Sequence, residues 1–369
     1  MKLRTWNSHD VKTGTRVFLR VDANVPIKHG QAQDGGVFGR ISQSLPEIEL
    51  LRKRGAAIVL AAHLDDPGGK IDKKKSLAPV AKIFEKRLKR SVPLVKDFDV
   101  PSLRPGELCM LENLRFDPGE EKNSDAFAWK LAKLADVYVN NAFGVCHRRH
   151  ASVHAITRHL PSFAGELVLR EVAELSAAIS RPFILVMGGS KIYTKIGLLN
   201  RLGPKADKIL LGGGLAVTFL AAAEVDLPAY PPDLMRESDV STARKLLRQF
   251  SDRIILPVDL MARPKQHVVS DIGPETCALF ASELSGAKTI IWNGPLGIIE
   301  RADGQAGTLS VAKAMTKSGA RVVTGGGETV EFLEAHKLTR GFAHVSTGGG
   351  AMLALLAGEH LPGLEALRA

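Results

Sequence analysis

The segment KILLGGGLAVTFL, residues 208–220, contains a short apolar run, three glycines and a second apolar stretch. This order is typical of a buried strand that turns through glycine into a helix. Other short apolar runs alternate with helical patterns along the whole chain: RVFLRV (16–21), AAIVLAA (56–62), CMLEN (109–113), VYVN (137–140), FILVM (183–187), IILPV (254–258), TIIWN (289–293) and RVVTG (321–325). The alternation predicts the α/β class, with parallel sheets covered by helices and ligands at the carboxyl ends of the strands.

The length of 369 residues is sufficient for two domains, each with its own core. Between Pro161 and Pro182 the sequence has an apolar face at helical spacing, which includes Leu167, Val168 and Val172. We expect a first domain over 1–165, a long interdomain helix over 166–182 and a second domain over 183–349. An ordinary crossover helix inside one domain is the alternative.

The composition argues against several classes of protein. Lys and Arg exceed Asp and Glu, for a net charge of +11, but aromatic residues are only 5% and no nucleic-acid-binding motif is present. No run of about 18 apolar residues predicts a membrane span, and the N-terminus lacks the apolar core of a secretory signal. Three scattered cysteines without a CxxC motif favour a reducing, cytoplasmic setting. We expect a monomer that binds a small anion, with no nucleic-acid or membrane partner.

Cationic side chains follow the apolar runs of the first half. Arg20, Asp22 and Asn24 come from RVFLRVDANVP, and Arg115 comes from MLENLRF. Arg40 begins a helical pattern, and NNAFGVCHRRHAS contributes His147, Arg148, Arg149 and His150. A guanidinium group can bind two oxygens of one phosphate or carboxylate at the same time. Several such groups together therefore predict a site for a multiply charged anion. A metal site at the His/Arg cluster is a weaker alternative, because the cluster lacks carboxylate and Cys ligands.

Glycine runs follow the apolar runs of the second half: MGGSK (187–191), LGGGL (211–215), TGGGE (324–328) and STGGG (346–350). Adjacent glycines let backbone N–H groups converge on an anion, and Lys191 and Lys195 follow the first run. Neither the GxxxxGK[ST] nor the GxGxxG motif is present. Together the runs predict a polyphosphate site, and the two halves together predict the layout of a bilobal kinase.

The chain resembles the phosphoglycerate kinase family from end to end, through RVDANVP, ENLRF, PGEEKN, LADVYVNNAFG, HRRHAS, GGSKIYTKIGLL, LGGGLAVTFL, DIGPET, WNGPLG and HVSTGGGAML. The resemblance implies two hinge-linked, Rossmann-like three-layer domains, with residues 350–369 returning to the first. It implies reversible phosphoryl transfer between ATP and the carboxylate of 3-phosphoglycerate, giving 1,3-bisphosphoglycerate, with Mg²⁺. Alternatives are a paralogue acting on another carboxylic acid or phosphonate, and a non-catalytic nucleotide-binding relative.

The resemblance also implies roles for individual residues. The catalytic positions are Arg40, Lys195 and Gly349. The acid-substrate positions are Asp22, Asn24, His63, Arg115 and Arg148, to which we add Arg149 as a neighbouring cation. The nucleotide positions are Gly188, Lys191, Lys195, Gly213, Asn293, Pro295, Glu300, Gly327, Glu328 and Thr329, and Glu328 is also the metal position, where the family usually has Asp.

The sequence departs from the family at HLDDP, residues 63–67, because Asp66 stands where the family usually has an Arg that binds the substrate phosphate. Three outcomes are open. Asp66 turns into solvent while Arg149 replaces the lost cation, or Asp66 pairs with an Arg and changes the acid preference, or acid binding is lost. A metal site at Asp65 and Asp66 is the least favoured interpretation, since no further carboxylates flank them. HLDDP is therefore interpreted as an altered anion site.

Overall fold

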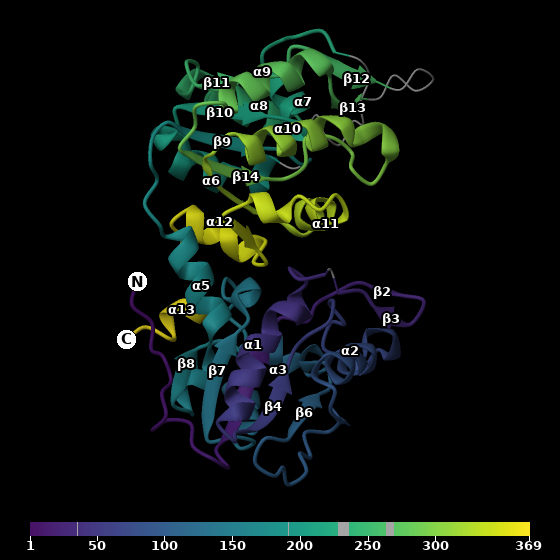
Figure 1. Ribbon diagram of the computed structural model, residues 1–369, viewed down its shortest axis with the longest axis vertical. Coiled ribbons are helices and arrows are strands. Elements are labelled where there is room, and N and C mark those ends of the chain that lie inside the picture. The colour runs from purple at the N-terminus through teal and green to yellow at the C-terminus, as the bar shows by residue number, and fades with distance from the viewer. Residues whose placement is uncertain (35, 191, 228–235, 263–268) are drawn as a thin grey trace. The chain divides into compact units, whose positions relative to one another are not determined.

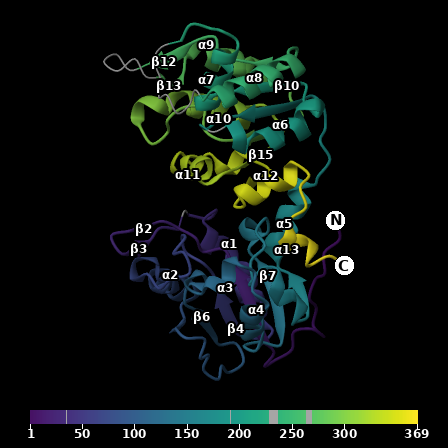
Figure 2. The same cartoon turned by 180° about the vertical axis from the view of Figure 1, so that it is seen from behind.

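The computed structural model describes residues 1–34, 36–190, 192–227, 236–262 and 269–369. The chain divides into two compact units, one formed by Met1–Glu174 with His360–Ala369 and the other by Leu175–Glu359. Each unit has a six-stranded sheet with helices packed around it (Figures 1 and 2). The predicted α/β class with parallel sheets is therefore confirmed.

The sheet of the first unit has the strand order β5-β6-β4-β1-β7-β8, and all its strands are parallel. The strands are β1 (Arg16–Val21), β4 (Ala57–Ala61), β5 (Leu94–Val95), β6 (Leu108–Leu111), β7 (Val137–Asn141) and β8 (Ser162–Ala164). Helices α1 (Arg40–Lys53), α2 (Ala78–Leu88), α3 (Pro118–Glu121), α4 (Asp125–Ala132) and α13 (Pro362–Glu365) belong to this unit, as does the short antiparallel pair β2 (Ile27–Lys28) and β3 (Gln31–Ala32). Strands β4, β6 and β7 are buried along their full length, as expected of a covered parallel sheet.

The register of the first sheet brings the predicted site residues to one edge. Arg16 of β1 is opposite Ala57 of β4, and Val17 is opposite Val137 of β7. Because parallel strands end at the same edge, the segments that follow β1, β4, β6 and β7 converge there. This edge is called the anion edge below.

The sheet of the second unit has the order β11-β10-β9-β14-β15-β16 and is also parallel. Its strands are β9 (Phe183–Met187), β10 (Lys208–Leu211), β11 (Ile254–Ile255), β14 (Thr289–Asn293), β15 (Arg321–Gly325) and β16 (His344–Ser346). Its helices are α6 (Ile196–Leu202), α7 (Gly213–Ala222), α8 (Glu237–Gln249), α9 (Pro274–Leu284), α10 (Ala306–Lys317), α11 (Gly327–Ala335) and α12 (Gly350–Leu356). An antiparallel pair, β12 (Leu260–Ala262) and β13 (Val269–Ile272), lies outside the main sheet.

The segment between the sheets is less helical than predicted. Helix α5 spans Glu166–Leu175 rather than 166–182, and the division between the units falls at its last residue. The conformation of Arg181 is restricted because it precedes Pro182, which disfavours helical backbone at that position. This restriction acts on Arg181 alone and does not account for the end of the helix at Leu175.

The C-terminal return also begins later than predicted. Residues 350–359 belong to the second unit, where α12 packs against α6 and buries Ala351, Met352 and Leu356. The return to the first unit starts at His360, and the Gly363 N–H donates to the Cys146 carbonyl. The apolar side of α12 is therefore covered by the second unit, and only the last ten residues cross back.

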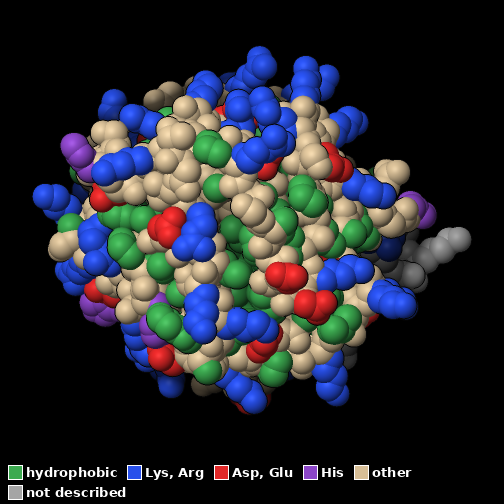
Figure 3. All heavy atoms as spheres, turned by 90° about the horizontal axis from the view of Figure 1, so that it is seen from below, with side chains coloured by type: hydrophobic (Ala, Val, Ile, Leu, Met, Phe, Trp, Pro, Cys, Tyr) green, Lys and Arg blue, Asp and Glu red, His purple; other side chains and the backbone are tan. Residues whose placement is uncertain are grey.

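Much of the positive charge lies on exposed surface. Figure 3 shows Lys and Arg side chains prominent on the face that it displays. The last turns of α1 and α2 contain Arg52, Lys53, Lys86 and Arg87. Cations at this end of a helix interact favourably with its dipole, which accounts for part of the excess without a partner. No helix of the described ranges is long and apolar enough to span a membrane.

Candidate active site

Arg40 is held at the anion edge by the segment that follows β1. It is the first residue of α1, and its Nη1 donates to the Asn24 carbonyl over 2.9 Å. The same nitrogen lies 3.4 Å from Oδ1 of buried Asp22. The Asp22 carboxylate thus orients a half-buried guanidinium that remains accessible to a ligand.

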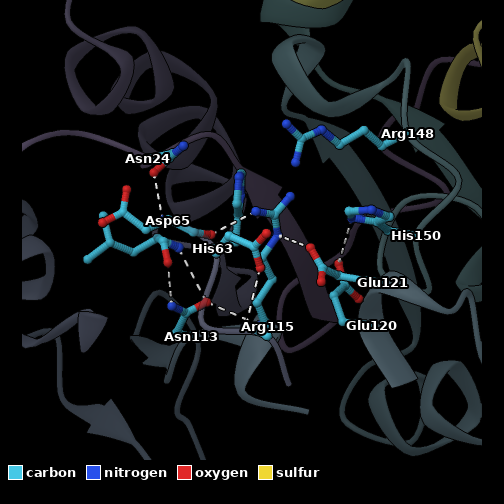
Figure 4. A network of polar contacts seen from close by, with 12 residues as sticks. Asn24, His63, Asp65, Asn113, Arg115, Glu120, Glu121, Arg148 and His150 are labelled. Carbon is cyan, nitrogen blue, oxygen red and sulfur yellow. Dashed lines mark hydrogen bonds and ion pairs between the residues drawn. The ribbon is translucent and has the colours of Figure 1, made fainter. Parts of the chain in front are cut away.

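Arg115 comes from the turn after β6 and is only 4% exposed. Its Nη1 donates to the Asp65 carbonyl over 2.7 Å, and its Nε lies 3.2 Å from Oε1 of Glu121 (Figure 4). The Nε contact is an ion pair without hydrogen-bond geometry, and Nη2 has no hydrogen-bond partner among the described residues. Since a buried donor without an acceptor is costly, Arg115 is suited to an anionic ligand.

His63 follows β4 and is also buried. Its Nδ1 lies 3.1 Å from Nη2 of Arg20, which is fully buried in β1. Burial and the charges of Arg20, Arg115, Arg40 and His150 hold the pKa of His63 well below its usual value. His63 is therefore neutral at neutral pH.

The loop after His63 has an unusual backbone. Asp65 has a positive φ of 51°, and its N–H donates to Oδ1 of Asn24 over 2.9 Å. Oδ1 of Asp66 accepts the N–H of Gly68 over 3.2 Å, and the Lys75 ammonium donates to the Asp66 carbonyl. The Asp66 carboxylate is exposed and forms no ion pair with any described residue. The Asp66 charge still acts on the anion edge. Burial and nearby cations lower the pKa of His150, and the Asp66 carboxylate raises it.

Arg148 and Arg149 follow β7 and are both exposed. Nε of Arg148 donates to His147 Nε2 over 3.3 Å, and in Figure 4 its guanidinium extends to the side where Arg115 lies. Nη2 of Arg149 instead lies 3.4 Å from Nε2 of His154. Binding of an acid by Arg149 stays a prediction, and in this structure its guanidinium contacts His154.

In the second unit a cavity of about 230 Å³ opens where β9, β10 and β14 end. Four predicted nucleotide residues line it: Gly213, Pro295, Glu300 and Glu328. Its apolar wall includes Val217, Leu260, Val269, Leu296 and Ile298. A cavity with both an apolar wall and glycine backbone is suited to a ligand that combines a flat ring with phosphates.

Close backbone packing shapes this cavity. A Cβ built on Gly188 would lie 2.0 Å from the Pro295 carbonyl oxygen. Gly213 has a φ of 61°, and a Cβ there would lie 2.8 Å from the same oxygen. The Gly189 N–H donates to this carbonyl over 2.7 Å. Glycine is thus required at 188 and 213 because three loops meet main chain to main chain.

Lys195 lies at the start of α6 and is 8% exposed. Its ammonium donates to Oδ1 of Asn293, whose Nδ2 donates to the Gly325 carbonyl over 2.8 Å. Burial lowers the pKa of Lys195 to about 8, although the Glu328 carboxylate opposes the shift. The predicted residue Lys191 lies outside the described residues.

Three further predicted residues come from the segments after β15 and β16. Gly327 and Thr329 lie in the first turn of α11, and the hydroxyl of buried Thr329 has no hydrogen-bond partner among the described residues. Gly349 is the N-terminal cap of α12, with a φ of 45° and open space where a Cβ would lie. An unpaired buried hydroxyl and open backbone at these strand ends are suited to a phosphate ligand.

Comparison with known proteins identifies the family of this chain. Residues 8–359 match the family model described as phosphoglycerate kinase. The chain belongs to the phosphoglycerate kinase family. The phosphoglycerate kinase of Desulforudis audaxviator is 43% identical over 385 aligned residues, covering 96% of each chain. That of Moorella thermoacetica is 40% identical, covering 95% of this chain and 96% of the relative.

Solved structures of phosphoglycerate kinases are similar along almost the entire chain. The enzyme from Pyrococcus horikoshii has a TM-score of 0.88 at 30% identity and covers 98% of each chain. The enzyme from Coxiella burnetii has a TM-score of 0.83 at 34% identity and covers 97% of each chain. The predicted family and fold are therefore confirmed.

Sequence reasoning did not single out several residues that lie at or beside the candidate site. Glu120 and Ser152 are fully buried and join Arg20 to the anion edge. Asp271 lines the cavity of the second unit, and its Oδ2 accepts the Gly307 N–H over 2.7 Å; burial raises its pKa to about 6. The motifs PGEEKN, HRRHAS and DIGPET contain Glu120, Ser152 and Asp271, and were a usable signal.

Proposed function

We propose that this chain transfers a phosphoryl group reversibly between ATP and the carboxylate of 3-phosphoglycerate, giving ADP and 1,3-bisphosphoglycerate. The match to the family over residues 8–359 carries the proposal. A carboxylate oxygen of the acid attacks the γ-phosphorus, the bond to the bridging oxygen breaks, and ADP keeps the electron pair. No proton needs to move, so the protein contributes mainly position and charge.

The anion edge supplies the cations for the acid. We assign Arg115, whose buried Nη2 has no hydrogen-bond partner among the described residues, and Arg148 to the anionic groups of the acid. We assign Asn24 and His63 to hydrogen bonds with it. Asp22 acts by holding Arg40, whose charge we assign to the transferring phosphoryl group. Fixed cations at the point where negative charge spreads stabilise the transition state more than the bound substrate.

The cavity of the second unit supplies the nucleotide site. We assign the apolar wall to the adenine ring, the glycine loops at 188, 213, 327 and 349 to the phosphates, and Lys195 to the transferring phosphoryl group. Asn293 holds Lys195, and Thr329 offers its unpaired hydroxyl. Pro295 and Glu300 complete the wall.

Glu328 is suited to Mg²⁺ bound with the nucleotide. It lies in the first turn of α11 and lines the cavity, and one carboxylate is enough when phosphate oxygens and water supply the other ligands. The ion would neutralise charge on the phosphates. Among the described residues, no group of three or more His, Cys, Asp or Glu side chains could hold a metal ion by itself.

We further propose a cytoplasmic monomer. The three cysteines are free, and burial raises the pKa of Cys109 and Cys146 to about 12, so neither is a reactive thiolate. Sedimentation of the purified protein at micromolar concentration measures the oligomeric state directly.

A coupled assay of ADP release tests the proposed reaction. We expect turnover with 3-phosphoglycerate to exceed that with glycerate, a phosphonate analogue and other small carboxylic acids. Turnover of a different acid alone would identify a paralogue with changed specificity. Binding of MgADP without turnover of any acid would identify a non-catalytic relative.

Asp66 is expected to weaken binding of 3-phosphoglycerate. Asp66→Arg removes one negative charge beside the anion edge and adds one positive charge. We expect the KM for 3-phosphoglycerate to fall roughly thirtyfold, and the effect to shrink as salt is added.

Asp65→Asn is the matched control, because it removes a charge from the same exposed loop at a φ that Asn tolerates. Its effect on KM should be small. If Arg149 has replaced the lost cation, Asp66→Arg will change little and Arg149→Ala will raise KM instead. An unchanged KM in both Asp66→Arg and Arg149→Ala would disprove the altered-anion-site interpretation.

A further inference from the structure

A buried polar chain lies behind His63 in the first unit. Glu120 of α3, Ser152 and Arg20 of β1 are all completely buried. Arg20 Nε lies 3.0 Å from Ser152 Oγ, which lies 2.6 Å from Glu120 Oε1. The Ser152 N–H donates to Glu120 Oε2 over 2.9 Å. The chain ends at His63, whose Nδ1 lies 3.1 Å from Arg20 Nη2.

The chemistry of the groups determines the direction of every hydrogen bond. A guanidinium has donors and no acceptor, so Ser152 Oγ accepts from Arg20 and gives its own proton to Glu120. For the same reason His63 Nδ1 is the acceptor from Arg20 Nη2. The His63 ring therefore carries its proton on Nε2 and is neutral.

We propose that Glu120, acting through Ser152 and Arg20, is a positioning residue that fixes His63 as a neutral Nε2–H donor at the anion edge. Three contacts orient Arg20, because its Nη1 also donates to the Val21 carbonyl over 2.6 Å. Ser152 is held in turn by its carbonyl, which accepts the Tyr138 hydroxyl over 2.8 Å. The assignment of His63 to the acid substrate rests on the proposed function.

The charges around His63 favour this state. Arg20 of β1, Arg115 after β6, Arg40 of α1 and His150 after β7 all oppose a positive charge on the ring. Glu120 is the buried carboxyl group that offsets Arg20, and it lies 3.9 Å from His150 Nδ1 (Figure 4). Burial raises the pKa of Glu120, and the charge of Arg20 and the hydrogen bonds from Ser152 oppose that rise by favouring the carboxylate. Without the Glu120 carboxylate, Arg20 would keep only Asp22 as a neighbouring carboxylate, and its guanidinium would turn toward Asp22.

The proposal differs from a purely structural role for Glu120. The Glu120 carbonyl also accepts the Ala151 N–H over 2.8 Å, so the residue anchors the 150–152 segment as well. A structural anchor would affect stability alone. A positioning residue would also change the tautomer of His63 and the binding of the acid.

Nitrogen-15 NMR of the histidine rings in the full-length protein tests the proposal, with the His63 signals assigned by their loss in His63→Gln. We expect the neutral Nε2–H pattern from about pH 5.5 to about pH 8 in the parent. In Ser152→Ala and Glu120→Gln we expect both neutral tautomers to be populated. The KM for the acid substrate should rise about tenfold, with kcat changed less than about threefold.

Glu47→Gln is the matched control. Glu47 is also a buried carboxylate of the first unit, and it accepts from Trp6 Nε1 and the Glu166 N–H. The Glu47→Gln variant should have a lower free energy of unfolding, as Glu120→Gln does. Its His63 spectrum and its KM for the acid should equal those of the parent.

Ser152→Ala keeps the protein testable if Glu120→Gln does not fold, since the backbone N–H of residue 152 still donates to Glu120. The spectrum needs no turnover, so it separates this proposal from the proposed reaction. A parent His63 that carries a proton on Nδ1, or a spectrum unchanged in Ser152→Ala, would overturn the proposal.

Discussion

Replacing Lys195 with alanine is expected to lower the turnover number by about 100-fold or more, with only a small change in the affinity for MgADP. The ammonium is buried against Asn293 and beside the carboxylate of Glu328, so it is a fixed charge rather than a mobile one. A fixed cation stabilises the transferring phosphoryl group most when charge spreads over its oxygens. Rapid-mixing turnover and calorimetry with MgADP measure the two quantities separately.

Lys205→Ala is the control, because Lys205 is an exposed cation of the same unit that does not line the nucleotide cavity. Its turnover should equal that of the parent. A loss of MgADP affinity in Lys195→Ala as large as its loss of turnover would show that Lys195 only binds the ground state.

The same lysine predicts a pH dependence. Its pKa is lowered from 10.5 to about 8 in the free protein, so its charge is lost as pH rises through about 8. We expect kcat/KM for MgATP to fall as the pH rises above about 8. The unfolded state binds the extra proton between these pH values, so the free energy of unfolding should rise with pH through this window. Lys195→Ala should lose this rise.

Replacing Gly188 with alanine is expected to reduce the affinity for MgADP by about 100-fold or more and to destabilise the second unit. The new Cβ would lie 2.0 Å from the Pro295 carbonyl oxygen, so the loops after β9 and β14 must separate. The Gly188 N–H donates to the Asn293 carbonyl over 3.0 Å, and this bond would be strained. Displacing site groups by about 1 Å can cost two orders of magnitude. Calorimetry with MgADP and chemical denaturation measure both effects.

Gly286→Ala is the matched control, since a Cβ there meets nothing within 4 Å and the backbone has no positive φ. We expect parental affinity and stability in this variant. Millimolar MgADP should bind the parent readily. Parental MgADP affinity in Gly188→Ala would mean that this main-chain contact does not shape the cavity.

The strand ends were predictable from the sequence because their chemistry is local. An apolar run followed by glycine or by a charged residue marks the position where the chain leaves a covered strand, as in FILVM before Gly188 and RVFLRV before Asp22. Short strands were missed where the run is two or three residues long, as in β5 and β16. Such runs are too short to produce a periodic pattern.

The sequence by itself determined the fold class and the family and predicted two kinds of site, because strand–loop–helix units and glycine or cationic strand ends are patterns of consecutive residues. Only the tertiary structure decided how the side chains pair. Arg20 meets Ser152 across 132 positions of the chain, and Ser152 meets Glu120 across 32. It also decided that Asp66 accepts the Gly68 N–H in its own loop while Arg149 contacts His154. These pairs depend on the order β4-β1-β7 and on loop backbone angles, which follow from the packing of the whole unit and not from any local pattern.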